Sequence, residues 1–134
     1  MEQQLTDRAG APVTVRVEEA GGVGSYIISV ADGETAGRAD FVDSGSGVEL
    51  ERIIFHTEVD EQFGGRGLAG ILVREALHDS IRSGFGIVPV CPLFASHLKK
   101  HGDEFIAEGG VFRRPKRDDL VLVSKRARSS RADG

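Results

Sequence analysis

The sequence contains few of the residues that mark secreted, membrane-spanning or nucleic-acid-binding proteins. Cys91 is its single cysteine, so no disulfide can form within the chain. No apolar run approaches the roughly 20 residues that cross a bilayer, and residues 1–8 have neither the basic start nor the apolar stretch of a signal peptide. We therefore expect a cytoplasmic protein that has no membrane partner.

Positive charge is also scarce before the C-terminal region. The chain carries 17 Lys and Arg against 21 Asp and Glu, which gives a formal net charge of −4. Its two late basic clusters, residues 113–117 and 125–128, are typical of a solvated loop and a frayed chain end. Because a nucleic-acid groove needs a continuous basic surface, no nucleic acid is expected as a partner.

Metal ligands are equally sparse, since one cysteine and four scattered histidines leave no group with metal-ligand spacing. What remains is an ordinary composition for a globular protein, with 40% hydrophobic and 28% charged residues. A chain of 134 residues is long enough for one sizeable core. We predict a single domain over residues 1–124, a disordered basic tail over 125–134, and no metal site.

The first half of the chain predicts β-strands. Valines alternate with polar residues over 13–19, which is the pattern of a half-buried strand, and further strands are expected over 25–30 and 35–42. The pair Asp32-Gly33 is a strong hairpin signal between the last two. Residues 1–12 are polar, and we expect them to be loosely held.

A longer fourth strand is predicted over residues 48–59. Its apolar positions change parity between Leu50 and Ile53, which indicates a β-bulge near Arg52. Beyond the bulge, alternation divides the residues between two faces of the strand. One face would carry Ile53, Phe55, Thr57 and Val59, and the other would carry Ile54, His56 and Glu58.

The second half of the chain predicts helices around one short strand. Apolar residues recur at helical spacing over 68–82, and a strand over 87–91 follows, which suggests a crossover to a parallel neighbour. A second helix is expected over 93–101, and a last edge strand over 120–123. The order of elements predicts an α+β fold with a mixed, largely antiparallel sheet flanked by helices. On the first helix, the residues expected to point away from the core are Arg74, Glu75, His78 and Arg82.

Between the fourth strand and the first helix lies a glycine-rich turn, residues 61–70. Gly64, Gly65 and Gly67 tolerate the positive φ angles that turn backbone N–H groups inward, and they leave those groups uncovered. The following helix adds unpaired N–H groups and the positive end of its dipole. Such a turn favours phosphate, so we expect it to hold the pyrophosphate of a nucleotide-like cofactor.

Two common phosphate-binding motifs do not fit this turn. A P-loop ends in Gly-Lys followed by Ser or Thr, whereas the last glycine of this turn is followed by leucine. The dinucleotide fingerprint G-x-G-x-x-G is present as Gly65, Gly67 and Gly70. A Rossmann domain also needs an acidic residue about 20 positions later, where this chain has Val90-Cys91-Pro92. NAD is therefore not the expected cofactor.

A third template fits the turn and its surroundings. The run Gln62-Phe63-Gly64-Gly65-Arg66-Gly67 resembles the Q/R-x-x-G-x-G/A signature of the GNAT superfamily of N-acetyltransferases. The resemblance extends to a small subfamily of minimal GNAT-like proteins, whose pattern is similar to His56-Thr57-Glu58-Val59, Leu72-Val73-Arg74-Glu75-Ala76-Leu77 and Val88-Pro89-Val90-Cys91-Pro92. The similarity extends over about residues 25–105.

The resemblance implies a sheet that splays in a V between the fourth and fifth strands, with the pantetheine arm of coenzyme A in the opening. It implies acetyl-CoA or coenzyme A as the cofactor and an amine, on a small molecule or a protein, as the acceptor. We expect a monomer or a weak homodimer. The residues expected to bind the cofactor are Thr57, Val59, Gln62, Gly64, Gly65, Arg66, Gly67, Leu68 and Ala69.

Three residues near the expected thioester are candidates for catalysis. Cys91 precedes a helix, and it could accept the acetyl group as a thiolate or be a small buried apolar side chain. His56 or Glu58 could take the proton from the incoming ammonium, or could be structural groups. Many GNAT enzymes carry a tyrosine that protonates the departing thiolate, but the only tyrosine here is Tyr26. The nearest equivalent is His97, which could donate a proton or could be a hydrogen-bonded core histidine.

The leading hypothesis is an acetyl-CoA-dependent N-acetyltransferase. The alternative is a non-catalytic module that binds or senses coenzyme A or acyl-CoA. The two hypotheses differ in whether Cys91 and His56 matter for anything beyond stability.

Overall fold

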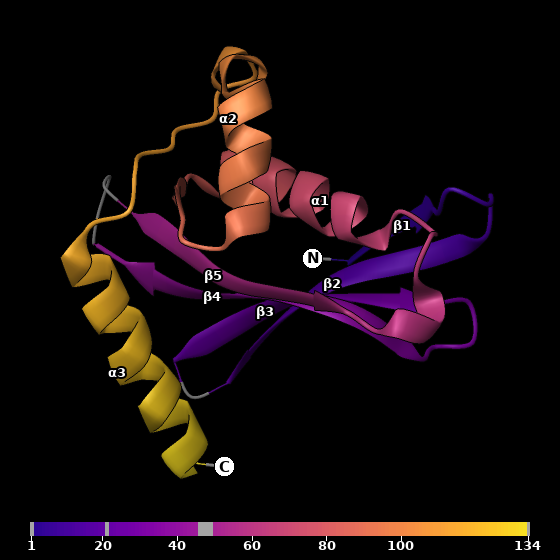
Figure 1. The fold of residues 1–134 in the computed structure, drawn as a ribbon, viewed down its shortest axis with the longest axis horizontal. Helices are drawn as coiled ribbons and strands as arrows, with labels where there is room; N and C mark the ends of the chain where they lie inside the picture. Colours follow the sequence, from indigo (N-terminus) through magenta and orange to yellow (C-terminus); the bar gives the residue numbers. More distant parts are fainter. Residues whose placement is uncertain (1, 21, 46–49, 134) are drawn as a thin grey trace.

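The computed structural model of the protein describes residues 2–20, 22–45 and 50–133 (Figure 1). Its strands are β1 (Glu2–Thr6), β2 (Pro12–Ala20), β3 (Val23–Val30), β4 (Thr35–Ser44), β5 (Glu51–Val59) and β6 (Gly86–Pro89). Its helices are the short 3₁₀ helix η1 (Glu61–Phe63) and the α-helices α1 (Leu68–Ser83), α2 (Pro92–Ala107) and α3 (Arg117–Asp133). The predicted strand start at Val48 and the last tail residue, Gly134, lie outside the described residues.

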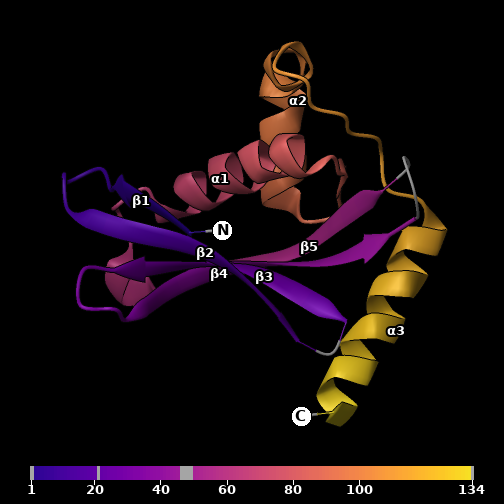
Figure 2. The ribbon, with the colours of Figure 1, turned by 180° about the vertical axis from the view of Figure 1, so that it is seen from behind.

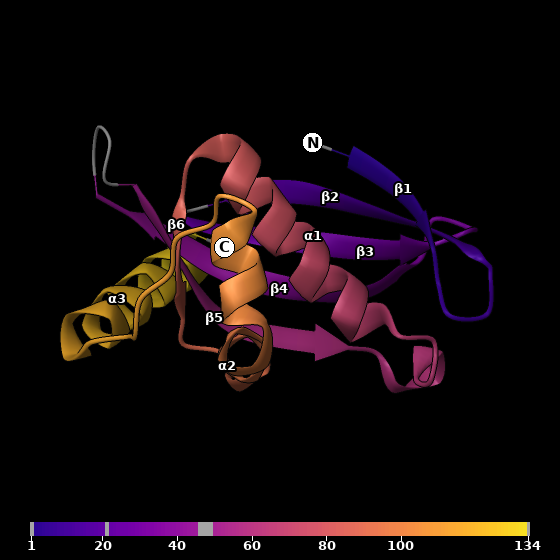
Figure 3. The ribbon, with the colours of Figure 1, turned by 90° about the horizontal axis from the view of Figure 1, so that it is seen from above.

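The strands form one sheet in the order β1-β2-β3-β4-β5-β6. Neighbours pair antiparallel, except that β5 and β6 are parallel and are joined through α1. Helices α1 and α2 lie on one face of the sheet and α3 lies against the other (Figures 1 and 2). Seen from above, α1 crosses the strands diagonally (Figure 3). The predicted α+β fold with a mixed, largely antiparallel sheet is confirmed.

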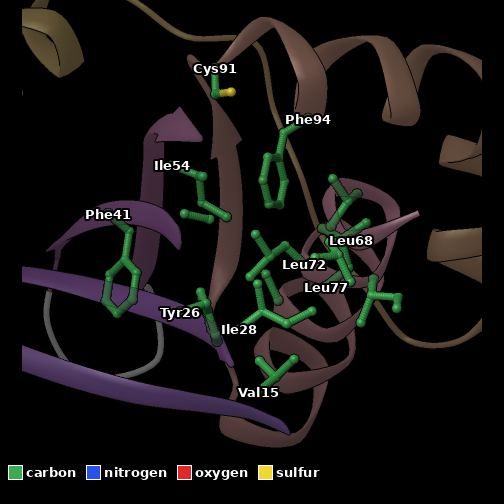
Figure 4. Close-up of a cluster of buried hydrophobic side chains, with 14 of the residues drawn as sticks. Val15, Tyr26, Ile28, Phe41, Ile54, Leu68, Leu72, Leu77, Cys91 and Phe94 are labelled. Atoms are coloured by element: carbon green, nitrogen blue, oxygen red, sulfur yellow. The ribbon is translucent and has the colours of Figure 1, made fainter. Parts of the chain in front are cut away.

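The main core lies between the sheet and helices α1 and α2. Alternating strand residues such as Val15 of β2 face this core, and α1 contributes the stripe that its helical spacing predicts, including Leu72 and Ala76. Figure 4 shows Ile54 of β5 and Phe94 of α2 pointing into the same cluster. The first turn of α2 is thereby packed against the strand that precedes the glycine turn.

A smaller core lies on the opposite face of the sheet. Val42, Ile53 and Val88, from β4, β5 and β6, are fully buried there, and Leu122 and Val123 of α3 pack against them. Both faces of β5 are therefore covered near its start, which explains why consecutive isoleucines at this point are both buried.

Helix α3 corrects two predictions for the end of the chain. Residues 120–123, predicted as an edge strand, and residues 125–133, predicted as a disordered tail, belong to this helix. Asp118 and Asp119 lie in its first turn, where negative charge stabilises a helix. The Asp119 carboxylate also accepts the backbone N–H of Lys116 at 2.6 Å, as in a capping box. The helix therefore forms although the short apolar run at residues 120–123 is typical of a strand.

Within the described residues, none of the helices has the length and apolar character needed to cross a membrane.

The chain start is also more ordered than its composition predicts. Residues 1–12, expected to be loosely held, include β1, which pairs along β2 with Leu5 opposite Val13. Leu5 is the only strongly apolar residue of β1 and packs against the main core. An edge strand of this kind is defined by backbone pairing with its neighbour, and side-chain alternation alone does not reveal it.

The β-bulge in β5 lies three residues beyond its predicted position near Arg52. Register moves from the pair Asp40 and His56 to the pair Phe41 and Ile54, so Phe55 is the extra residue. Arg52 itself is regularly paired and only 5% exposed. The change of parity between Leu50 and Ile53 arises without a bulge, because the side chain of Arg52 also points into the protein.

The position of the bulge changes which residues of β5 share a face. Cross-strand partners lie on the same face of a sheet, and Thr57 is opposite the buried Ala39, whereas His56 is opposite Asp40. Thr57 therefore faces the α1–α2 side, and His56 and Glu58 face the other side. The predicted grouping of Thr57 with Ile53 is wrong, because the extra residue reverses the alternation.

The sheet splays directly after the bulge. Pairing between β5 and β6 ends at Ile54 and Pro89, and the backbone N–H groups of Val90 and Cys91 both donate to the Ile54 carbonyl, at 3.0 and 2.9 Å. β5 then continues to Val59, whereas the segment that follows β6 turns into α2. A bulge bends and twists its strand, so it supplies a local cause for the predicted V between these two strands.

Candidate cofactor-binding and active site

The glycine turn that follows β5 has the backbone shape that its sequence predicts. Asp60 caps η1 by accepting the backbone N–H of Gln62, and the Gly64 N–H donates to the Glu61 carbonyl at 3.0 Å. Gly65 and Gly67 have φ angles of 81° and 76°, in the left-handed region that strongly favours glycine. Gly67 is the N-cap of α1, so the turn leads directly into the helix.

The backbone N–H groups of this turn are available for a ligand. In the described part of the chain, the amides of residues 65–70 donate to no protein acceptor. The first turn of α1 contains no acidic residue, so nothing there offsets the positive end of the helix dipole. Consecutive free N–H groups at a helix start are the arrangement that binds phosphate oxygens, which fits the pyrophosphate of coenzyme A.

The hairpin between β1 and β2 holds this turn in position. The Arg8 N–H donates to the Arg66 carbonyl at 2.9 Å, and Arg66 Nε donates to the Asp7 carboxylate. Asp7 is enclosed in the protein and also accepts the N–H groups of Ala9 and Ala11 at 2.9 Å each. The Ala11 hydrogen bond, aided by Arg66 and Ala9, holds the pKa of Asp7 below its usual value, although burial opposes the shift. Asp7 is therefore ionised at neutral pH.

Two of the residues predicted to bind the cofactor have side chains that are paired within the protein. Arg66 is paired with Asp7, as above, and the Gln62 amide donates to Glu34 at 3.1 Å. Gln62 thus connects the turn to the β3–β4 hairpin. These side chains fix the shape of the turn, and the backbone carries the groups that fit a phosphate.

Arg8 is a cationic residue that the motif does not contain. Its guanidinium Nε and Nη2 lie 3.5 and 3.6 Å from the point that a Cβ atom on Gly67 would occupy. The side chain is exposed and lies beside the start of α1. Sequence reasoning missed Arg8 because only the pairing of β1 with β2 brings the first hairpin to this turn.

Cys91 and Thr57 meet where the splay begins. Cys91 is the N-cap of α2 and is 4% exposed, and its thiol donates to the Thr57 hydroxyl at 3.3 Å. Figure 4 shows Cys91 above Ile54 and Phe94, at the edge of the main core. The two residues come from opposite sides of the V, so their contact lies at its apex. The predicted neighbours Val59 and Leu68 also pack on this side of the sheet.

His56 and Glu58 form a separate pair on the other face of β5. His56 Nε2 lies 3.4 Å from Glu58 Oε2, and the two side chains are 49% and 55% exposed. Arg38 on β4 lies 3.3 Å from Glu58 and 3.3 Å from Asp40. The three predicted catalytic residues are therefore not one cluster: the cysteine lies on the helix side of the sheet and the two candidate bases on the opposite side.

His97 lies away from the Cys91 thiol, in a groove between α1 and α2. Arg74 and His78 line this groove from α1, and the His97 ring lies 5.0 Å from that of His101. Partial burial, together with the nearby His101 and Arg74, lowers the pKa of His97 below its ordinary value. His97 is therefore neutral at pH 7. Tyr26 is buried and donates to Asp79, far from the splay.

Outside the splay, one buried network ties β5 to the rest of the fold. The Arg52 guanidinium makes two hydrogen bonds to Asp43, at 2.8 and 3.0 Å, and donates to the Tyr26 hydroxyl at 2.7 Å. It lies between the rings of Phe41 and Phe85, at 3.9 and 4.2 Å from their centroids. This network explains how a charged residue occupies a core position in β5.

Among the described residues, no three His, Cys, Asp or Glu side chains are arranged as metal ligands.

The model of the GCN5-related N-acetyltransferase family matches residues 25–107 of this chain. The chain belongs to this family. The match begins in β3 and ends with α2, so it contains the glycine turn, the splay and Cys91. The hairpin that carries Arg8, and helix α3, lie outside the matched residues of this family member.

Solved structures of two acetyltransferases resemble this family member at low sequence identity. A ribosomal-protein-alanine N-acetyltransferase from Brucella melitensis biovar Abortus 2308 is 15% identical over 71% of this chain and 52% of its own, with a TM-score of 0.44. An acetyltransferase from Trypanosoma brucei is 17% identical over 72% of this chain and 66% of its own, with a TM-score of 0.48. The chain thus spans about half of the first and less than two thirds of the second. No curated protein matches the chain.

Proposed function

We propose that this protein is an acetyl-CoA-dependent N-acetyltransferase that transfers an acetyl group to an amine. The observation that carries the proposal is the continuity of one site. The unpaired N–H groups of residues 65–70 lie at one end, and the splay with Cys91 and Thr57 at its apex lies next to them along β5. A phosphate-binding turn and an opening beside the same strand fit the two ends of coenzyme A.

In this proposal each part of the site has a defined task. The free backbone amides of residues 65–70 bind the pyrophosphate, whereas the predicted Gly64 amide is already paired with Glu61, and Arg8 adds a positive charge beside them. Thr57 and Val59 line the pantetheine from β5. Bound acetyl-CoA supplies a thioester activated toward attack by an amine. His56 or Glu58, exposed on the far face of the same strand, accepts the proton of the incoming ammonium.

The proposal leaves two routes for the acetyl group. In direct transfer, the amine nitrogen bonds to the acetyl carbon, the thioester C–S bond breaks, and the CoA sulfur takes up a proton. In the covalent route, the Cys91 Sγ loses its proton and bonds to the acetyl carbon, the CoA C–S bond breaks, and the CoA sulfur takes up a proton. The amine nitrogen then bonds to the acetyl carbon of the Cys91 thioester, the Sγ–C bond breaks, and the Cys91 thiol is regenerated with the proton that the amine gives up. The Cys91 thiol donates a hydrogen bond to the Thr57 hydroxyl and is almost fully buried, which favours direct transfer.

A second candidate function is a non-catalytic module that binds coenzyme A or acyl-CoA. The separation of Cys91 from His56 and Glu58 favours it, because the candidate nucleophile contacts Thr57 and the two candidate bases contact each other. In such a module the residues at the apex would be structural, and the glycine turn alone would carry the function.

Intact-protein mass spectrometry after incubation with acetyl-CoA separates these candidates. The wild type and Cys91→Ala are compared, and acetyl transfer to a panel of amines is followed in parallel. A single acetyl group that is absent from the variant supports the covalent route. Turnover without an adduct, retained in Cys91→Ala and reduced by His56→Gln, supports direct transfer. Bound coenzyme A without any turnover supports the non-catalytic module.

Binding of coenzyme A is measured separately by titration calorimetry. Arg8→Gln removes one charge next to the turn, and we expect the Kd for coenzyme A to rise about threefold to tenfold, which corresponds to an exposed charge-assisted contact. Arg82→Gln removes the same charge at the other end of α1 and serves as the matched control. A wild type that binds no coenzyme A would show that the interpretation of the glycine turn is wrong.

A further inference from the structure

A second groove lies on the side of α2 that faces away from α1. It has a volume of about 530 Å³ and runs between α2 and the extended segment 112–115. Its apolar lining comes from β6, from α2 and from this segment: Pro89, Ala95, Leu98, Phe112 and Pro115. This α2 groove shares no lining residue with the glycine turn or with Thr57 and Cys91, and the proposed acetyltransferase chemistry does not use it.

The wall of the α2 groove is held firmly in place. Gly102 of α2 leaves room for the Phe112 ring, which a Cβ atom at that position would approach to 2.7 Å. The Ile87 N–H donates to the Val111 carbonyl at 2.8 Å, and the Arg113 N–H donates to the Ile87 carbonyl at 3.1 Å. The segment is thereby attached both to α2 and to the edge of β6, so the groove is a fixed feature of the fold.

Arg113 holds the same segment to the rest of the protein. Its guanidinium donates to Glu51 on β5 at 2.8 Å and to Asp119 on α3 at 2.9 Å, in each case through two hydrogen bonds. The charge of Arg113 is therefore compensated within the protein. It contributes to the wall of the groove and adds no free positive charge.

The remaining cations of the α2 groove are uncompensated. Lys99, Lys100 and Arg114 are exposed, and the ion pairs found among the described residues include none of them. Asp103 is the one carboxylate in the lining. The rim thus carries a surplus of positive charge on a chain whose net charge is −4. Charge complementarity selects a negatively charged partner at this place.

We propose that the α2 groove binds a short segment of a partner protein in which apolar side chains lie next to Asp or Glu. Its floor suits apolar anchors, which supply most of the affinity at small interfaces. Its rim pairs with carboxylates, which supply specificity and orientation. A nucleic acid fits less well, because the Phe112 ring packs on Gly102 and the cations form a rim instead of a track along a backbone.

The partner segment binds close to the proposed active site without overlapping it. Pro89 lines the groove and stands two residues before Cys91, at the end of the β5–β6 pairing. The glycine turn lies at the start of α1, on the other side of α2 (Figure 3). Binding of the segment therefore requires neither coenzyme A nor catalytic activity, and it is testable with the protein alone.

The first experiment is selection from a display library of random dodecapeptides on the full chain. Fluorescein-labelled versions of the enriched peptides are then titrated against wild type and variants by fluorescence anisotropy. We expect enriched peptides to combine leucine, isoleucine or phenylalanine with Asp or Glu. Lys99→Gln combined with Lys100→Gln, and separately Arg114→Gln, should weaken binding at least fivefold. Lys125→Gln on α3 is the control for charge removal elsewhere.

A pair of α2 variants tests the location directly. Ala95→Glu introduces a carboxylate into the groove and should weaken binding of the same peptides at least tenfold. Ser96→Glu introduces the same group at the next position of the helix, which is exposed and not part of the groove lining, and should leave binding unchanged. Circular dichroism confirms that both variants fold.

Three outcomes would overturn the proposal. One is a library that yields no peptide bound by the wild type, and another is a set of peptides whose affinity is the same for Ala95→Glu and Ser96→Glu. The third is tighter, variant-sensitive binding of a ten-nucleotide single strand of DNA, which would assign the rim to nucleic acid.

Discussion

Gly67, like Gly65, has a left-handed backbone conformation at the proposed cofactor site. Its φ of 76° strongly disfavours a residue with a Cβ atom, and that atom would lie against the Arg8 guanidinium. We expect Gly67→Ala to lower the free energy of unfolding by about 1–2 kcal/mol and to weaken coenzyme A binding. Gly70→Ala is the matched control, since Gly70 lies within α1, where alanine is favoured by up to about 1 kcal/mol.

Urea unfolding of the two variants measures the change in the free energy of unfolding, which should be negative for Gly67→Ala and positive for Gly70→Ala. The space beside Gly70 is limited by the flexible Arg74 side chain at 3.3 Å, which can move aside. Equal destabilisation by both substitutions would mean that the left-handed geometry at Gly67 is not required in solution.

His97 makes the stability of the fold depend on pH in a direction that can be stated. Burial, His101 and Arg74 lower its pKa in the folded protein below the value of about 6.5 found in an unfolded chain. Below that pH the unfolded chain binds a proton more readily, so the contribution of His97 to stability falls as the pH decreases. The wild type should therefore lose stability relative to His97→Gln between pH 7.5 and pH 5.

Urea unfolding of both proteins at pH 7.5, 6 and 5 provides this comparison, and an NMR titration of the His97 ring measures the pKa directly. The comparison with His97→Gln isolates the effect of this residue from that of the three other histidines in the chain. A His97 pKa of 6.5 or above would contradict the prediction.

Among the elements, α3 offers the sharpest test of the structure. Leu122 packs against the core under the sheet, whereas its neighbour Val121 is 57% exposed. Leu122→Asp should lower the free energy of unfolding by about 2 kcal/mol, because the apolar contacts of leucine are lost and a carboxylate is placed against apolar side chains. Val121→Asp should change it by less than about 0.5 kcal/mol. Thermal unfolding followed by circular dichroism measures both, and equal effects would show that α3 does not dock on this face.

The elements also show where sequence patterns predict structure and where they do not. Helix α1 was predictable because its apolar stripe is regular and Gly84 ends it. The bulge was displaced in the prediction because the buried Arg52 breaks the apolar pattern, and its partners Asp43 and Tyr26 lie on other strands. Helix α3 was missed because its cap depends on one carboxylate, that of Asp119, at the start of a basic segment.

At the scale of the whole molecule, some parts of the proposed cofactor site were predictable from the sequence and others were not. The glycine turn was predictable from local sequence, whereas the splay was predicted only from the resemblance to the GNAT superfamily. The separation of Cys91 from His56 depends on the extra residue at Phe55, which alternation alone placed elsewhere. Arg8 depends on the pairing of β1 with β2, and no local motif marks it.

The connection between the first hairpin and the glycine turn predicts a response of the whole fold to coenzyme A. A ligand that binds only the folded state stabilises it, by about 2.7 kcal/mol at roughly 100 times the Kd. Because Asp7 joins the hairpin to Arg66, hydrogen exchange in residues 7–11 should slow when coenzyme A binds to the turn. In Asp7→Asn, the ionised acceptor is lost, and this protection of the hairpin should disappear while residues 65–70 remain protected.

Asp32→Asn is the matched control for this measurement. Asp32 also accepts a backbone N–H within a hairpin, that of Glu34 at 2.9 Å, but it makes no contact with Arg66. Its substitution should leave the response of residues 7–11 to coenzyme A unchanged. Because the pKa of Asp7 lies below its usual value, the hairpin response should persist in the wild type down to about pH 4 and be lost only below that. A hairpin that exchanges at the same rate with and without bound coenzyme A would mean that the Asp7–Arg66 pair does not couple the two parts of the fold.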